Sequence, residues 1–191
     1  NARHLAEKAV VGLVPDAVYA GFMGRTASEL AWCAAAIQAA GGRVPSLRLA
    51  VCGPPPEVVS ATCRRVVDRV DYLGVLTPQR VREFASVLDV GLLPLDDTPF
   101  NQSRFPIKFA EYLGAGVPVV MSDVGECAAI ARDWPWVLRA SAGEAAFCDL
   151  FTVAASRAGD GSLPSVDMAV VGASLGWGRV AEIMESAYAG A

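Results

Sequence analysis

The sequence has no surplus of basic side chains. Its 191 residues include 16 lysines and arginines against 20 aspartates and glutamates, which gives a net charge of −4. A protein whose main partner is nucleic acid needs a basic face to neutralise phosphates. We therefore expect no nucleic-acid partner.

Histidine and closely paired cysteines are also scarce. His4 is the single histidine and is expected to be an ordinary surface residue. With no second histidine, neither a histidine-based triad nor a multi-histidine metal site can be built. The five cysteines are scattered and contain no CxxC pair, which indicates buried thiols in a reducing compartment. Asp96, Asp97 and Asp123 are a weak indication of a metal site, because loop aspartates commonly form turns. We expect no bound metal.

Long apolar runs are absent, although apolar residues make up 53% of the chain. No run approaches the roughly 20 residues that a membrane-spanning helix needs. The first residues, NARHLAEK, lack the apolar segment of a signal peptide. These features predict a cytoplasmic protein with a sizeable core. The first residue is not methionine, and we expect the chain to be a piece of a longer protein.

Strand and helix patterns alternate along the chain. Strands are expected at residues 17–22, 47–52, 70–73, 89–93, 117–120 and 136–138. Helices are expected between them, one ending near residue 68 and one that opens at Thr77-Pro78 and runs through Ser86, with a last amphipathic helix at 176–189. Strict alternation predicts an α/β fold with a doubly wound, parallel, six-stranded, Rossmann-like sheet. In the strand order 3-2-1-4-5-6, strands one and four are neighbours. The loops at 22–28 and 94–104 would then meet at the carboxyl edge, where ligands bind.

The first of these loops offers groups that bind anions. Gly24, Arg25 and Thr26 stand just before a helix, whose free backbone N–H groups and guanidinium neighbour suit a diphosphate. The ordinary alternative is a loop glycine beside a solvated arginine. There is no Gly-x-Gly-x-x-Gly fingerprint after the first strand and no Walker loop, so a nicotinamide, flavin or Walker-type nucleotide site is not favoured.

The second loop leads into a helix that carries a charged pair. Asn101 or Ser103 can cap this helix, and Pro106 suits its first turn. Lys108 and Glu111 are three residues apart and lie on one helix face. Lys108 could contact an anion and Glu111 a sugar hydroxyl; the ordinary alternatives are a solvated lysine and an intrahelical pair of Glu111 with Lys108. Farther along, Trp134 and Trp136 are interpreted as core or interface residues rather than a stacking platform.

Several segments together resemble a known family. The runs DVGLLPL and RFPIKFAEYLGAGVPVVMSDVGE, preceded by AVYAGFMGR, LRLAVCGPPP and VDYLGVLTPQRV and followed by GWGRVAEIMESAYAG, are similar to the carboxyl-terminal, donor-binding half of GT-B glycosyltransferases. The similarity is closest to the retaining enzymes of group 1, or family 4, which use nucleotide-diphosphate sugars.

The resemblance implies a role for each matching residue. Glu111 would hold the nucleotide ribose, and Arg25 and Lys108 would act as catalytic cations at the donor diphosphate. The remaining donor-binding residues would contact the phosphates, the sugar or the base through backbone and side chains; they are Gly24, Ser103, Arg104, Pro106, Ile107, Gly74, Val75 and Leu76. The sequence departs from the family pattern at Ser103, where an acid is usual, and at Leu30, where a lysine is usual. Lys108 can supply the missing positive charge.

The expected function follows from that resemblance. Residues 1–191 would form a single donor-binding domain that needs an amino-terminal acceptor domain for catalysis, with retention and without a cofactor. The expected partners are the nucleotide sugar and that domain, and peripheral membrane association of the full-length enzyme is left open. Two alternatives stand beside this prediction, a sugar-nucleotide epimerase of the same architecture and a degenerate domain that only binds a partner.

Overall fold

One sheet of six parallel strands runs through the part of the chain that the computed structural model describes, which is residues 7–9, 11–141, 143–176 and 178. The neighbours follow the order β3-β2-β1-β4-β5-β6. The predicted doubly wound topology is therefore confirmed, with β1 and β4 side by side. In chain order the strands are β1 (Val18–Met23), β2 (Leu47–Cys52), β3 (Val70–Tyr72), β4 (Val90–Leu93), β5 (Val119–Ser122) and β6 (Val137–Ala140).

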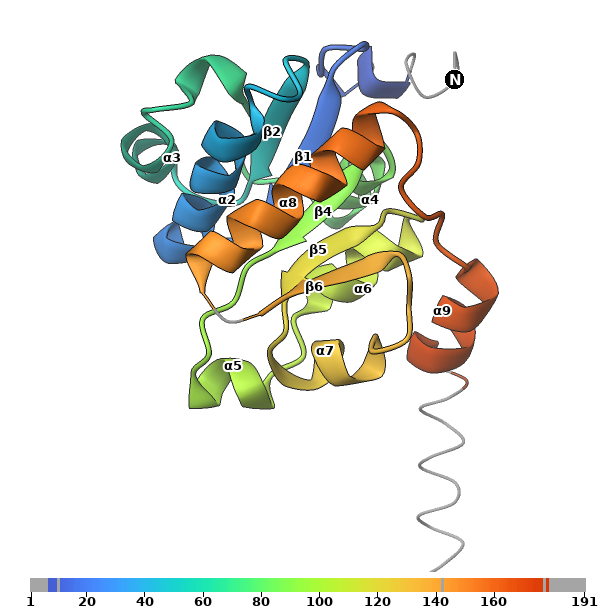
Figure 1. The fold of residues 1–191 in the computed structure, drawn as a ribbon. Coiled ribbons are helices and arrows are strands. Elements are labelled where there is room, and N and C mark those ends of the chain that lie inside the picture. The colour runs from blue at the N-terminus through green and yellow to red at the C-terminus, as the bar shows by residue number, and fades with distance from the viewer. Residues whose placement is uncertain (1–6, 10, 142, 177, 179–191) are drawn as a thin grey trace, which may run out of the picture.

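Helices cover both faces of the sheet (Figure 1). One face packs against α2 (Ala27–Ala40), α3 (Pro56–Thr62) and α8 (Glu144–Gly159). The other face packs against α4 (Pro78–Ser86), α6 (Ile107–Gly114), α7 (Gly125–Ile130) and α9 (Met168–Leu175). Two further short elements are the 3-10 helix η1 (Val67–Arg69) and α5 (Pro99–Ser103).

The central strands explain why the core has two halves. Every residue of β4 and β5 is buried. Successive side chains of a strand point to opposite faces, so Leu92 joins the apolar cluster beneath α2 and α8 while Leu93 joins the cluster beneath α4 and α6. Parallel strands covered on both faces need such continuous apolar runs. Trp136 is also buried, and Trp134 stacks on Phe109, so both tryptophans belong to the core as predicted.

Most predicted elements exist, with shifted ends. The strand at 47–52 and the helix from Pro78 to Ser86 have the predicted bounds, and the side chain of Thr77 caps that helix by accepting from the N–H of Arg80. The fifth strand begins at Val119 rather than at residue 117, because Pro118 has no N–H to give to the sheet. The helix after β2 was expected to reach residue 68, but it ends at Thr62.

The segment before α6 differs from the prediction. It was expected to be a polar loop whose Asn101 or Ser103 capped the next helix; instead both residues lie inside α5, which Thr98 caps. The following helix begins only at Ile107, with Pro106 in the cap position before its first turn. The residue before a proline disfavours the helical backbone conformation. The chain before Pro106 therefore leaves the helical conformation, and α5 and α6 are separate helices.

Two predictions fall largely outside the described residues. They are the helix at 176–189, of which the structure describes only residues 176 and 178, and the surface position of His4. The helix α9 was not predicted. None of the described helices is both long enough and apolar enough to cross a membrane.

Candidate functional site

A hollow of about 580 Å³ opens at the carboxyl edge of the sheet, where β1 ends and α2 begins. Its volume lies within the roughly 300–1,000 Å³ that is usual for small-molecule sites. Seven of the residues predicted for the donor site line it together: Gly24, Arg25, Arg104, Pro106, Ile107, Lys108 and Glu111. The structure thus brings the two predicted loops into one site, although 65 residues of chain, 29–93, separate them.

The turn after β1 is held close to its neighbours. The N–H of Gly24 donates to the carbonyl of Cys52, the last residue of β2. A Cβ atom at Gly24 would lie 2.8 Å from the ring of Phe22 and 3.4 Å from Nζ of Lys108, so glycine lets this turn approach both. Thr26 follows in the cap position of α2 without a side-chain capping bond. The positive end of the helix therefore faces the hollow without a protein hydroxyl on it.

Three cationic side chains line the hollow. Arg25 is exposed and makes no hydrogen bond or ion pair with any described residue. Lys108 and Arg104 meet the carboxylate of Glu29 instead, with Nζ of Lys108 2.6 Å from Oε2 and a guanidinium nitrogen of Arg104 2.8 Å from Oε1. The alternative of an intrahelical Lys108–Glu111 pair is therefore wrong.

Sequence reasoning missed Glu29. It lies in the first turn of α2, and its partners are 75 and 79 residues away. An acid four residues after Arg25, at a helix start expected near a basic loop, was the available indication. A second missed residue is Asn101, whose Oδ1 accepts from Nε of Arg104 at 2.7 Å.

Glu111 is shared between this hollow and a second one beside α4. It lines the hollow beside Lys108 and also the second one, of about 530 Å³, together with Pro78, Arg82 and others. Within the described chain its carboxylate forms no ion pair, so its oxygens are open to a ligand.

The remaining predicted residues lie near the site without lining either hollow. The carbonyl of Gly74 accepts from the N–H of Gly53 at 2.9 Å, so the segment after β3 stands at the same edge of the sheet. Val75 is exposed and Leu76 is half-buried against the core. Ser103 is exposed at the end of α5, where its hydroxyl donates to the carbonyl of Phe100.

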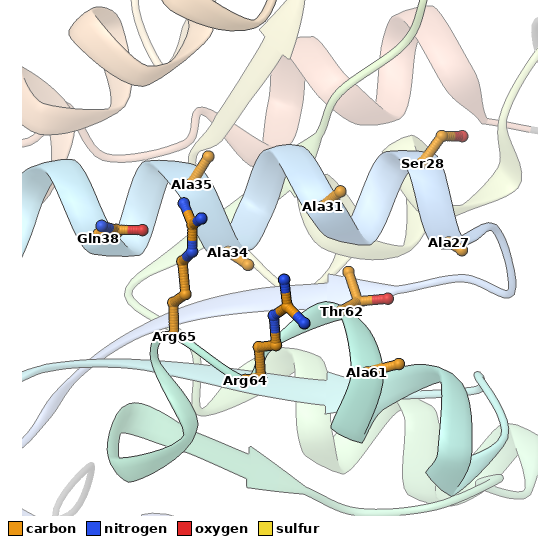
Figure 2. Close-up of a pocket in the computed structure, with 10 residues that line it drawn as sticks. All are labelled: Ala27, Ser28, Ala31, Ala34, Ala35, Gln38, Ala61, Thr62, Arg64 and Arg65. Carbon is orange, nitrogen blue, oxygen red and sulfur yellow. The ribbon is translucent and has the colours of Figure 1, made fainter.

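A different hollow, of about 530 Å³, lies between α2 and the end of α3 (Figure 2). Ala31, Ala34 and Ala35 are among the residues that line it from α2, and Arg64 and Arg65 reach toward α2 from the other side. Both hollows use α2, but they share no lining residue, and no carboxylate lines this one.

Thiol and metal chemistry find no support at the site. Burial raises the pKa of Cys33, which lies close to Lys108 and Glu29, well above its usual value. A thiol held protonated is a poor nucleophile. Within the described ranges no group of three or more His, Cys, Asp or Glu side chains is arranged to hold a metal ion.

Comparison with known proteins shows the family. The model of the family "Glycosyl transferases group 1" matches residues 15–159. This match covers the whole sheet and every residue that lines the hollow. The chain belongs to the group 1 glycosyltransferases.

Individual relatives support the same fold. AviGT4, a glycosyltransferase involved in avilamycin A biosynthesis, superimposes with a TM-score of 0.67 at 21% identity over 90% of this chain and 50% of its own. HepE from Anabaena, solved in complex with UDP and glucose, gives 0.64 at 14% identity over 97% of this chain and 53% of its own. A putative teichuronic acid biosynthesis glycosyltransferase, TuaH from Bacillus subtilis, is 39% identical over 51 residues, which are 27% of this chain and 13% of that protein. The chain spans about half the length of AviGT4 and of HepE.

Proposed function

We propose that this chain is the donor-binding domain of a glycosyltransferase that takes a sugar from a nucleotide-diphosphate sugar and transfers it with retention. The observation that carries this proposal is the meeting of Arg25, Arg104 and Lys108 at the start of α2. Three cations outnumber the two carboxylates that line the same hollow, and a helix N-terminus adds positive potential. A diphosphate is the ligand chemistry that such a site favours.

The arrangement also orders the parts of a nucleotide. Lys108 and Glu111 are one helical turn apart on α6, so a ribose bound at Glu111 would follow directly from phosphates bound at Lys108. The second hollow leads on from Glu111 to Pro78, shortly after the Gly74–Leu76 segment proposed for the base. HepE, which has the same fold, was solved with UDP and glucose.

Arg25 and Lys108 would then work as electrostatic catalysts. Negative charge builds on the diphosphate as the sugar leaves, and fixed cations stabilise the transition state where that charge develops. This role needs no bound metal or cofactor. Retention and the requirement for an amino-terminal acceptor domain are inferred from the family resemblance.

Calorimetry with the 191-residue chain tests the donor site. UDP, GDP and ADP are titrated in turn, and one of them is expected to bind in the millimolar range or tighter. Arg25→Ala and Lys108→Ala should each weaken that binding about tenfold, the loss of one charge-assisted contact. Arg43→Ala is the matched control, because it removes one exposed charge beyond the far end of α2. Equal effects of all three variants, or no binding, would contradict the proposal.

The reaction itself is tested with the full-length protein. NMR of the product should show the donor's anomeric configuration preserved, whereas an inverted product would overturn retention. Release of epimerised sugar nucleotide would favour the epimerase alternative. Full activity in both Lys108→Ala and Glu111→Ala would favour a domain that only binds a partner.

A further inference from the structure

The carboxylate of Glu29 bridges two cations that the chain brings from another element. Oε1 accepts from Arg104 and Oε2 from Lys108, so each oxygen serves a different cation. The relative exposures of the three side chains are 9% for Glu29, 11% for Lys108 and 29% for Arg104. Glu29 and Lys108 are therefore buried to nearly the same extent, and Arg104 is the more exposed partner.

Further contacts fix each cation separately. Asn101 accepts from Nε of Arg104 at 2.7 Å and itself donates to the carbonyl of Asp96 at 2.8 Å. Nζ of Lys108 lies 5.1 Å from the ring centre of Phe22 on β1. Both cations are thus tied to the carboxyl edge of the sheet before any ligand arrives.

A carboxylate at this place has two opposite effects on an anion. Its negative charge lowers the positive potential of the hollow and should weaken anion binding. Its two hydrogen bonds hold the flexible side chains of both cations in one geometry and keep two like charges close together. This should strengthen anion binding, because these side chains lose less conformational entropy when the anion binds. Because the two cations share both oxygens of this buried carboxylate, we expect the second effect to be the larger. Because each oxygen accepts a hydrogen bond from a different cation, one carboxylate fixes both cations at once.

We propose that Glu29 is a positioning residue, which holds Lys108 and Arg104 so that both donate to the donor diphosphate. This inference rests on the proposed function of the site. Leu30, the next residue of α2, is fully buried and carries no charge. The first turn of α2 therefore supplies the orienting carboxylate, and the two cations that Glu29 holds come from the segment at 104–108.

Glu29→Gln separates the two effects. Glutamine has nearly the same shape, removes the negative charge and presents at most one acceptor oxygen to the two cations. If Glu29 positions the cations, affinity for inorganic pyrophosphate and for UDP should fall about fivefold or more despite the gain in positive charge. Binding of uridine, which has no phosphate, should not change. Unchanged or tighter pyrophosphate binding would overturn the inference and leave Glu29 a neutralising group only.

The chain allows a direct observation of Lys108, because it contains only one other lysine, Lys8. Lys8 is buried against Asp89 at 2.7 Å and is an internal control. In protein labelled with nitrogen-15 lysine, pyrophosphate should shift the Nζ signal of Lys108 and leave that of Lys8 in place. Glu29→Gln should move or broaden the Lys108 signal even without ligand.

The two hypotheses fail in different ways. A wild-type Lys108 signal that neither pyrophosphate nor UDP perturbs would contradict the proposed function. If pyrophosphate shifts the Lys108 signal with the same affinity in wild type and in Glu29→Gln, only the role of Glu29 is contradicted. Should Glu29→Gln lose the native amide spectrum, Glu29→Asp decides, since it keeps the charge but is one methylene too short to reach both cations. Wild-type affinity in that variant would overturn the inference.

Discussion

The hydroxyl of Tyr112 donates to the carbonyl of Gly21 at 2.8 Å and accepts from the N–H of Met23 at 3.1 Å. Tyr112 lies on α6 and is fully buried, whereas Gly21 and Met23 belong to β1. These bonds join the helix that carries Lys108 and Glu111 to the strand that ends at Gly24. They set the distance between the two halves of the candidate site.

Tyr112→Phe should destabilise the fold by about 1–3 kcal/mol, because it leaves two buried backbone groups without their side-chain partner. Urea unfolding followed by circular dichroism measures the change. The same variant should also weaken diphosphate binding, since the two hydrogen bonds that hold α6 in place on β1 are lost. Tyr72→Phe is the control: its hydroxyl donates to the carbonyl of Pro54, away from α6. Wild-type stability of Tyr112→Phe would contradict this role.

Gly91→Ala tests how tightly the same tyrosine packs. A Cβ atom at Gly91 in β4 would lie 2.5 Å from the ring of Tyr112, and neither the strand nor the buried ring can easily move. We expect a loss of about 1–3 kcal/mol from overpacking. Gly172→Ala is the matched control, because a Cβ there, inside α9, meets nothing within 4 Å. That substitution should be neutral or stabilising by about 0.5–1 kcal/mol, and equal losses in both variants would contradict the packing argument.

Acid stability should depend on Asp71, at the edge strand β3. Burial tends to raise the pKa of its carboxyl, but hydrogen bonds from Arg48 and Tyr19 outweigh burial, and the net pKa is lowered. A folded pKa below the unfolded value of about 3.9 gives stability that is present above that value and is lost as the pH falls through the folded pKa. Asp71→Asn should therefore be less stable than wild type at pH 7. The difference, measured by urea unfolding across pH, should shrink below about pH 4; a constant difference would contradict it.

Alkaline stability should depend on Tyr19. Burial and the hydrogen bond to Asp71 raise the pKa of this phenol to about 12. A raised folded pKa gives stability that is complete below the unfolded value of about 10 and is lost as the pH rises toward 12. Tyr19→Phe should remove this part of the alkaline transition. An ultraviolet titration in which Tyr19 ionises with an ordinary pKa would contradict the prediction.

The five free thiols should react very unequally. Burial raises the pKa of Cys52 and Cys127 to about 12 and of Cys63 and Cys148 to about 11, and Cys33 is also raised. Cys148 is the one that is half-buried rather than buried. With a thiol reagent at pH 8 we expect one slow reaction in the native protein and five in denaturant, because the thiolate is the reactive form. Cys148→Ser should remove the native reaction, and fast native labelling of several thiols would contradict the burial.

Much of the fold was predictable because its indications are local. Apolar runs bounded by glycine and proline marked the strands, and the Thr77-Pro78 pair marked a helix start that the structure confirms. Two of the errors arose where one proline changed the outcome: Pro118 delayed β5 and Pro106 separated α5 from α6. These errors moved element ends but not the strand order, because the order depends on alternation of whole elements.

The sequence by itself determined the α/β class, the two loops of the site and the cations Arg25 and Lys108. Only the tertiary structure decided their relations: Lys108 pairs with Glu29 rather than with its helix neighbour Glu111, and Tyr112 ties α6 to β1. Local patterns reflect contacts within a few residues, whereas these contacts join segments about 80 or 90 residues apart. Such pairs become neighbours only after the parallel sheet places β1 beside β4, so no local spacing could reveal them.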